Sequence, residues 1–336
     1  MCKKYTFMNR HQFLLNAYRF AYKSVKYTQT YKEIIMNELE KHSLKNYSEV
    51  KLKGFVENGV ENVAKIMEMD RSSLSEFIRR QEEIIRERAK NETIYDNSIE
   101  RIELRDKIVR EYFNYFKDAD KNKHAVIVLG QIASGKSSYC KRLSERTNAM
   151  VVDSDYIKQG HDTMDGLKKD FDNGKGTDMI HEEASMLAKR IINEAAAEGF
   201  NLILPKTGIE SSSIQRIVNN LKNYNYHITL VYIDLSIEKC IERNYFRFID
   251  EYKQGIPSRL VPFKTIAMID DKPFKTFVKM VREQEFNGVD KFLAYSNNVN
   301  RGENMQSLDI DEMLEFDLQD NDYSDKINIS EVLEYI

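Results

Sequence analysis

Hydrophobic and polar positions follow two different patterns along this chain, and the change occurs near residue 124. Beyond it, short apolar runs alternate with amphipathic stretches of about 10 to 20 residues, an order typical of parallel βαβ units. The pattern predicts strands at residues 125–129, 150–152, 201–204, 227–233 and 291–295, and helices at 137–146, 182–198, 211–223 and 237–254. We therefore expect an α/β fold with a doubly wound parallel sheet covered by helices on both faces.

The first part of the chain lacks this alternation. Up to residue 129 it has two glycines, Gly54 and Gly59, and no proline, so it can form long helices with few breaks. Its apolar residues recur at helical spacing, as at Ile108 and Tyr112. We predict an all-α helical domain over residues 1–118, an α/β domain over 119–300 and an acidic C-terminal tail over 301–336.

A glycine-rich loop follows the first of the predicted strands, where residues 130–137 read Gly-Gln-Ile-Ala-Ser-Gly-Lys-Ser. This is the complete spacing of a phosphate-binding loop, in the expected place between a buried strand and a helix. Gly130 and Gly135 allow backbone N–H groups to turn toward phosphate oxygens. Lys136 can reach the β- and γ-phosphates, and the Ser137 hydroxyl can ligate Mg²⁺. The sequence therefore predicts binding of ATP or GTP with Mg²⁺, with further nucleotide contacts from Gln131, Ala133, Ser134 and Ser138.

Two carboxylates follow the second predicted strand. Asp153 and Asp155 are two positions apart, so they would share one face if the strand continued. The carboxyl ends of strands in an open α/β sheet lie at the crevice where ligands bind. One carboxylate could then assist Mg²⁺ or the loop while the other accepts a proton from a substrate hydroxyl. The alternative is a pair of aspartates that only cap the following loop.

Three arginines provide candidate contacts to the phosphates. Arg243 and Arg247 are one turn apart on the helix predicted at 237–254, so they project from the same face. Arg259 lies in a loop bounded by glycine and proline, of the kind that closes over a ligand. Such arginines can stabilise the charge that develops on a transferring phosphoryl group. The alternative is a solvated basic helix face paired with neighbouring glutamates.

Taken in order, these motifs resemble the zeta-toxin family of small-molecule kinases, over roughly residues 123–300. The likeness also includes the segments 182–188, 199–204, 242–247 and 257–262, and the pair Thr207-Gly208. The resemblance implies a P-loop kinase fold in which Asp155 activates the substrate hydroxyl. It also implies that Arg247 and Arg259 clamp the triphosphate, with Arg243 as an alternative nucleotide contact. Substrate contacts are then expected from Asp153, from Glu182 or Glu183, and from Lys206 and Thr207.

The chain departs from the family pattern at the substrate loop. Where family members carry an acidic residue and a glycine before the threonine, this chain has Pro205-Lys206. Ile209 stands where an arginine often lies. The change argues against the family's usual UDP-N-acetylglucosamine and favours an acceptor that bears phosphate or carboxylate.

We therefore expect a kinase that phosphorylates a hydroxyl of a small metabolite, with a nucleotide sugar or a dinucleotide as the favoured class. Two alternatives stay open. One is a polynucleotide 5′-hydroxyl kinase. Against it, the sequence near the loop has no stripe of basic residues interleaved with aromatic residues, which nucleic-acid binding would favour. The other is a nucleotide-gated binding module with a degenerate acceptor site.

The composition of the chain indicates the compartment in which this chemistry takes place. Charged residues make up 31% of the chain, and no apolar run approaches the length of a membrane span. The N-terminus has no apolar signal region. The cysteines are three and widely spaced, which fits neither a disulfide framework nor a zinc site. We expect a cytoplasmic protein with no membrane partner.

The last 34 residues, 303–336, carry eleven acids and one base, Lys326. The net charge of the whole chain is −3, so the preceding residues are mildly basic. The family resemblance further implies inhibition by a helical antitoxin that covers the nucleotide site. Residues 1–118 could act in this way in cis, or a partner protein could do so. The alternative is a helical extension that completes the core or recruits a partner.

Overall fold

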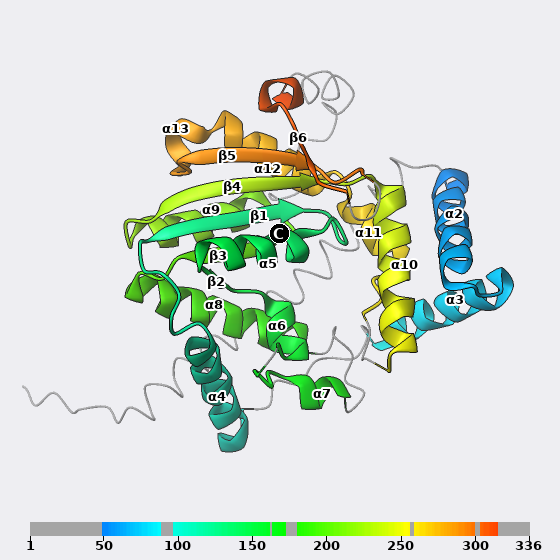
Figure 1. Cartoon of the computed structure of the whole chain (residues 1–336), viewed down its shortest axis with the longest axis horizontal. Helices are drawn as coiled ribbons and strands as arrows, with labels where there is room; N and C mark the ends of the chain where they lie inside the picture. The colour runs from blue at the N-terminus through cyan, green and yellow to red at the C-terminus, as the bar shows by residue number, and fades with distance from the viewer. Residues whose placement is uncertain are drawn as a thin grey trace, which may run out of the picture. The chain divides into compact units, whose positions relative to one another are not determined.

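The computed structural model describes residues 49–88, 97–161, 163–172, 180–255, 259–299 and 303–314. Within these residues, six strands form one sheet in the order β2-β3-β1-β4-β5-β6 (Figure 1). The strands are β1 His124–Gly130, β2 Met150–Val151, β3 Leu202–Lys206, β4 His227–Asp234, β5 Lys291–Ser296 and β6 Gln306–Ser307. Strands β1 to β5 pair in parallel, and β6 pairs antiparallel with β5. The predicted doubly wound α/β fold is confirmed, with one antiparallel strand at its edge.

Four of the described helices match the four predicted ones to within one residue at every end. The described helices are α2 Glu49–Met67, α3 Arg71–Arg88, α4 Ile99–Tyr115, α5 Lys136–Thr147, α6 Ser154–Gln159, α7 Lys168–Asp172, α8 His181–Glu198, α9 Ser211–Lys222, α10 Ile237–Lys253, α11 Phe263–Ile269, α12 Lys272–Arg282 and α13 Gln284–Asn287. None of these helices is both long and apolar enough to cross a membrane.

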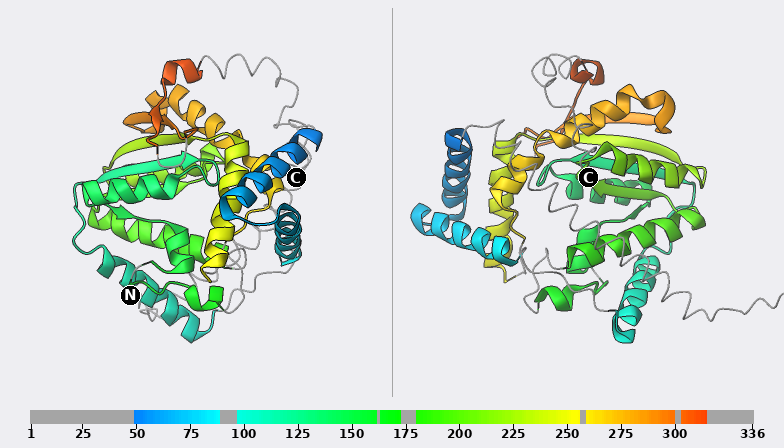
Figure 2. Two further views of the ribbon diagram at one scale, coloured as in Figure 1. Left: turned by 45° about the vertical axis from the view of Figure 1, so that its right-hand side comes forward. Right: turned by 180° about the vertical axis from the view of Figure 1, so that it is seen from behind.

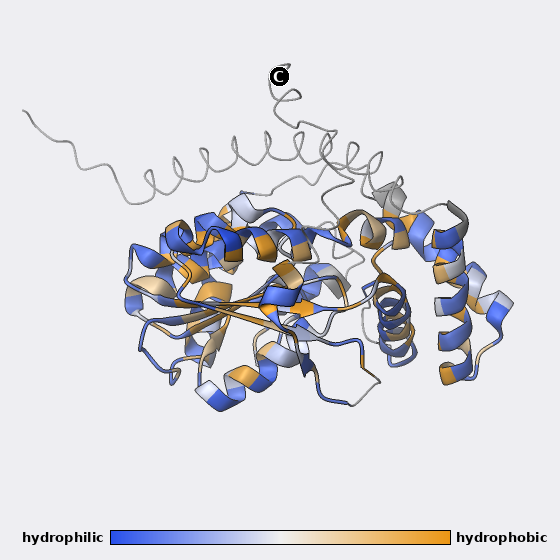
Figure 3. Ribbon diagram, turned by 90° about the horizontal axis from the view of Figure 1, so that it is seen from above, coloured by the Kyte–Doolittle hydropathy of each residue, from blue (hydrophilic) through white to orange (hydrophobic). Residues whose placement is uncertain are grey.

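Both faces of the sheet are buried. Successive side chains of β1 point to opposite faces, and each set lies in a hydrophobic core. Ile127 and Leu129 pack into a core shared with α8, α9 and α12. Val128 points to the other face, into a smaller core that includes Cys140 of α5. Helices are visible on both sides of the sheet in Figure 2, and the strands are mainly hydrophobic in Figure 3. Near-continuous apolar runs are what a parallel sheet covered on both faces requires.

Helix α4 belongs to the core of the α/β domain. Ile108, Val109 and Tyr112 of α4 are buried together with apolar residues of the sheet and of α8. The sequence predicts one helical domain over residues 1–118, but the last helix of that range shares the core of the sheet. We therefore propose that the α/β domain begins ahead of α4. Residues 1–48 lie outside the described residues.

The C-terminal segment contributes to the sheet edge. Gln306 and Ser307 form β6, and Leu308 and Met313 pack against the main core. Two polar residues carry no strand periodicity, so the sequence could not predict β6. The rest of the predicted acidic tail, residues 301–302 and 315–336, lies outside the described residues.

Candidate active site

The phosphate-binding loop connects β1 to α5, as the sequence predicted. A Cβ at Gly130 would lie 2.6 Å from the carbonyl oxygen of Ile233, so only glycine fits there. Gly135 has a φ of 94° and is the N-cap of α5, where a Cβ would lie 2.5 Å from Asn297 Nδ2. Ala133 also has positive φ, at 60°. Glycines and positive φ angles between a strand and the N-terminus of a helix are the backbone features that anion-binding loops use.

Lys136 curls back over the loop. Its Nζ donates hydrogen bonds to the carbonyl oxygens of Gly130 at 2.8 Å and Gln131 at 2.7 Å. Burial lowers the pKa of Lys136 to about 8, so this ammonium gains from an anionic partner. Ser137 and Ser138 follow in the first turn of α5 with exposed side chains. These positions fit a nucleoside triphosphate and a Mg²⁺ ion held by the Ser137 hydroxyl.

Side chains far away in the sequence hold the loop in place. Asn297, directly after β5, donates from Nδ2 to the Ser134 carbonyl oxygen at 2.7 Å and is buried. Gln131 is also buried and donates to the Ile266 carbonyl oxygen of α11 at 3.3 Å. Arg243 Nη2 donates to the Asn297 carbonyl oxygen at 3.0 Å. Sequence reasoning missed Asn297, although a polar residue at the carboxyl end of a parallel strand was the available signal.

The two aspartates do not share a strand face, because β2 ends at Val151. Asp153 is instead the N-cap of α6, and its Oδ1 accepts a hydrogen bond from the Asp155 N–H at 2.9 Å. This corrects the expected strand geometry, while capping is the alternative that the sequence also allowed. Burial and then the charge of Asp155 raise the pKa of Asp153. Asp155 lies in the first turn of α6 and is less buried.

Asp155 binds two cations. Its Oδ2 forms an ion pair with Arg259 Nη1, and its Oδ1 accepts from Lys158 Nζ at 3.1 Å. Burial alone would raise the pKa of Asp155, but Arg259 and Lys158 hold it well below its usual range. The structure therefore brings together the carboxylate and one of the arginines singled out in the sequence.

Arg247 and Arg259 lie next to each other with unsatisfied donors. Arg247 Nη2 donates to the Arg259 carbonyl oxygen at 3.5 Å. Among the described residues, the Nε atoms of both arginines are buried and have no hydrogen-bond partner. Burial and then the charge of Arg259 lower the pKa of Arg247 to about 10. Two adjacent guanidinium groups with free buried donors fit a polyanion such as a triphosphate.

Tyr112 of α4 bonds to the backbone on both sides of the connection between β2 and α6. Its hydroxyl donates to the Val151 carbonyl oxygen at 2.8 Å and accepts from the Asp153 N–H at 3.2 Å. Tyr112 is 1% exposed. The sequence placed this residue on a helical stripe and gave no sign of its contact with the site.

Glu183, one of two candidate substrate contacts on α8, is buried in an ion-pair network with α4. Arg105 Nε lies 2.6 Å from Glu183 Oε1, and Arg101 Nη2 lies 2.5 Å from Oε2. Arg101 also pairs with Asp170 at 2.5 Å. Because two arginines already neutralise Glu183, we favour the half-buried Glu182 as the substrate contact.

We expect Arg105→Ala to lower the free energy of unfolding by about 3 kcal/mol, because it leaves buried Glu183 with one cation instead of two. Urea denaturation measures this loss. Arg190→Ala is the matched control, since Arg190 pairs with Asp106 on the same two helices at 37% and 36% side-chain exposure. Its effect should stay below about 1 kcal/mol. A stable Arg105→Ala protein with a raised KM for the acceptor would instead return Glu183 to the substrate site.

Lys206 and Thr207 lie at the C-terminal end of β3, next to the phosphate loop. Lys206 is the register partner of Leu129, the residue before the loop. Burial lowers the pKa of Lys206, and the charge of Asp153 acts in the opposite direction. Thr207 is half-buried. A cation therefore lies close to Asp153, and the role of Lys206 in acceptor binding stays a prediction.

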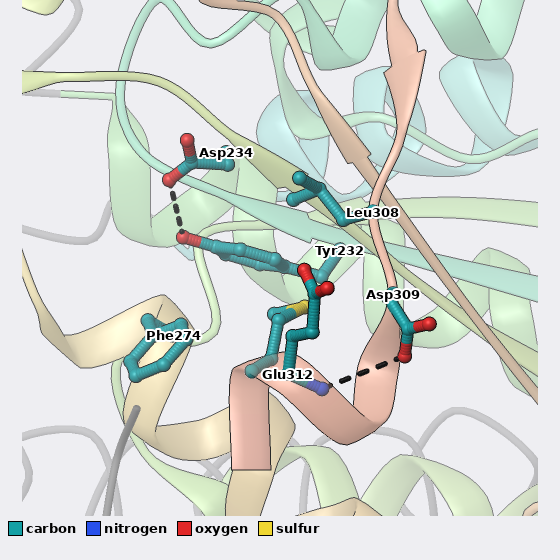
Figure 4. Close-up of a pocket in the computed structure, with 7 residues that line it drawn as sticks. Tyr232, Asp234, Phe274, Leu308, Asp309 and Glu312 are labelled. Atoms are coloured by element: carbon teal, nitrogen blue, oxygen red, sulfur yellow. Dashed lines mark hydrogen bonds between the residues drawn. The ribbon is translucent and has the colours of Figure 1, made fainter. Parts of the chain in front are cut away.

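A separate hollow of about 370 Å³ lies on β4 and the C-terminal segment (Figure 4). Tyr232 donates to Asp234 Oδ1 at 3.1 Å inside it. Its lining contains none of the predicted site residues, so we assign no part of the active site to it. The lining residues are Tyr232, Asp234, Phe274, Leu308, Asp309, Glu312 and Met313.

Comparison with known proteins shows what the chain is similar to. The family model described as Zeta toxin matches residues 107–304. A chain of the Autographa californica nuclear polyhedrosis virus that bears the name of a bifunctional polynucleotide kinase/RNA ligase is 26% identical over 137 residues. That match covers 38% of this chain but spans only 18% of the viral relative.

Two solved structures of low identity are also similar to this chain. A structure from the PezAT chromosomal toxin–antitoxin system of Streptococcus pneumoniae is 14% identical, with a TM-score of 0.48, covering 61% of this chain and 78% of that one. The AvrRxo1-ORF1:AvrRxo1-ORF2 complex with sulphate ions is 12% identical, with a TM-score of 0.47, covering 62% and 67%.

Proposed function

The chain belongs to the zeta toxin family, and we propose that this P-loop kinase transfers the γ-phosphoryl group of ATP or GTP to a hydroxyl of a small metabolite. The ion pair between Asp155 and Arg259 carries the proposal. It joins a carboxylate and a cation, which are the two groups that phosphoryl transfer requires in addition to the phosphate loop.

Each side chain has a role in this reaction. Lys136 and the loop N–H groups would bind the β- and γ-phosphates, and Arg247 and Arg259 would stabilise charge on the transferring group. Mg²⁺, when bound at Ser137, neutralises phosphate charge. Asp155 would orient the acceptor hydroxyl and take its proton.

The contact with Arg259 links binding to catalysis. With Arg259 and Lys158 holding its pKa low, Asp155 is a weak base. When Arg259 turns from Asp155 to a phosphate, that pKa rises and Asp155 becomes a stronger base. We propose that nucleotide binding activates Asp155 in this way.

The acceptor is proposed to be a nucleotide sugar or a dinucleotide. Lys206 supports an acceptor that already bears phosphate, because its ammonium stands beside Asp153 at the strand ends. The test is phosphoryl transfer from labelled ATP by the full chain to a panel of nucleotide sugars and dinucleotides. Nucleotide binding without transfer to any member would instead support the binding module with a degenerate acceptor site.

With an accepted substrate, Lys206→Ala should raise KM for the acceptor about tenfold and leave KM for ATP unchanged, since a charge-assisted contact is lost. The exposed Lys141→Ala is the control, because it also removes a lysine but on the outer side of α5. Equal effects on the two KM values would contradict a role for Lys206 in acceptor binding.

A second candidate is a polynucleotide 5′-hydroxyl kinase, favoured by the partial match to the viral chain of that name. Binding to labelled single strands over a salt titration distinguishes the two. Affinity that falls steeply with salt would support a nucleic-acid acceptor.

Inhibition by an antitoxin-like partner protein is also proposed, from the family alone. Inhibition in cis by residues 1–118 stays a prediction, and residues 1–48 of that range lie outside the described residues. Within the described part of that range, α4 is part of the core and Gly59 of α2 lies against α10.

A further inference from the structure

The hairpin of α2 and α3 packs closely against α10, the helix that carries Arg247. A Cβ added at Gly59 of α2 would lie 3.3 Å from Ile241 Cγ2. Phe77 of α3 stacks on Phe248, with ring centroids 5.8 Å apart. Figure 1 and both views of Figure 2 show the two helices beside α10. Apolar and aromatic side chains therefore join the hairpin to α10.

Polar contacts hold the hairpin along the length of α10. Asn62 Nδ2 donates to Glu242 Oε2 at 2.8 Å near the start of α10. Lys253 Nζ donates to the Met67 carbonyl oxygen at 2.9 Å at its end. The α2–α3 hairpin therefore contacts α10 near both of its ends.

Glu82 of α3 joins three segments through one carboxylate. It is 3% exposed, and its Oε1 accepts from the Phe263 N–H at 3.0 Å and from the Tyr245 hydroxyl at 3.4 Å. Burial and then Glu82 raise the pKa of Tyr245, which keeps that hydroxyl protonated as a donor. Phe263 begins α11, four residues after Arg259.

The 259–263 segment is also bonded to α10. Asn244 is fully buried and makes two hydrogen bonds with Val261, donating to its carbonyl oxygen at 2.9 Å and accepting from its N–H at 3.2 Å. Glu251 Oε2 accepts from the Arg259 N–H at 3.3 Å. Arg247 lies on α10 and Arg259 on the 259–263 segment, and hydrogen bonds from α3 and α10 join these two segments.

The hairpin and the arginines occupy opposite sides of α10. At about 3.6 residues per turn, Tyr245 and Phe248 face the hairpin, while Arg243 and Arg247 project from the other side. Burial and then the charge of Arg259 lower the pKa of Arg247, so the two guanidinium groups lie close to each other.

We propose that the α2–α3 hairpin positions Arg247 and Arg259, the arginine clamp, and that Glu82 is the positioning residue of the hairpin. The hairpin holds α10 and the 259–263 segment so that both guanidinium groups face the γ-phosphate. This inference rests on the proposed function, because it assumes that the two arginines bind the triphosphate.

Calorimetric titration of the full chain with Mg·ATP and with Mg·ADP tests the proposal. In Glu82→Leu, affinity for ATP should fall about tenfold while affinity for ADP changes less than about twofold, because a misplaced clamp affects only the γ-phosphate. Glu82→Gln retains an acceptor oxygen for the Phe263 N–H and should keep most of the ATP affinity.

Two further variants separate positioning from general damage. Glu83→Gln alters the exposed neighbour, which pairs with Arg79, and should leave both affinities unchanged. Gly59→Leu pushes α2 from α10 without weakening helix propensity, and should reproduce the selective loss for ATP. Equal losses for ATP and ADP, or unchanged ATP affinity in both Glu82→Leu and Gly59→Leu, would overturn the proposal.

Arg259→Ala shows how much ATP affinity is lost when one arginine of the clamp is removed. If it lowers ATP affinity selectively while the hairpin variants do not, the hairpin inference alone is wrong. If neither Arg259→Ala nor Lys136→Ala changes the binding of ATP, the proposed function fails and this inference fails with it.

Discussion

Arg259→Ala is expected to lower the rate of phosphoryl transfer about 10³-fold, because an arginine that stabilises the transferring group typically contributes at least that much. The guanidinium is half-buried beside Asp155 and has an unsatisfied Nε donor. Single-turnover kinetics with labelled ATP and an accepted substrate measure the rate of the chemical step.

Arg259→Lys should recover only part of that loss, since an ammonium cannot reproduce the planar fork. The control is Arg142→Ala, which removes an exposed arginine from α5. An Arg259→Ala enzyme within about threefold of the unmodified rate would remove Arg259 from the proposed clamp.

Asp155→Asn is expected to slow phosphoryl transfer by about 10² to 10⁴-fold while nucleotide binding is retained, because the amide cannot accept the proton of the acceptor hydroxyl. The carboxylate lies between Arg259 and Lys158, so the variant also frees two cations. ATP affinity should therefore not decrease, which distinguishes a lost base from a damaged nucleotide site.

The matched control is Asp165→Asn, which changes a 71%-exposed carboxylate that pairs with Lys107. It should leave the rate unchanged. If Asp155→Asn retains the unmodified rate and Asp153→Asn does not, then the buried cap residue is the base and the two roles must be exchanged.

Much of the fold could be predicted because its signals are local. The apolar run of β1, the glycines of the loop and the start of α5 are contiguous in sequence, so one short segment specifies strand, turn and helix. The five parallel strands were likewise found from apolar runs, since a sheet buried on both faces leaves few polar positions in its strands. Arg247 and Asp155 were proposed as site residues by the same local reasoning, from helix spacing and a strand end.

The short elements could not be predicted from local patterns alone. Two residues of β2 contain no period, and the next residues form α6, so Asp153 became a helix cap instead of a strand residue. The sequence allowed both outcomes because an aspartate after a strand can serve either purpose. Packing of Tyr112 against the strand end accompanies the capped form in the structure.

Contacts between distant positions were decided only by the tertiary structure. Asn297 holds Ser134 across 163 positions of sequence, and Glu82 holds Phe263 across 181. Neither asparagine nor glutamate carries a pattern that names its partner, because a buried polar group requires a hydrogen bond but does not specify which one. The sequence by itself thus determined the phosphate loop and the layers of the sheet, which depend on local spacing and burial. The fastening of the loop, the pairing of Asp155 with Arg259 and the hairpin behind α10 arise only when the folded chain brings distant side chains within bonding distance.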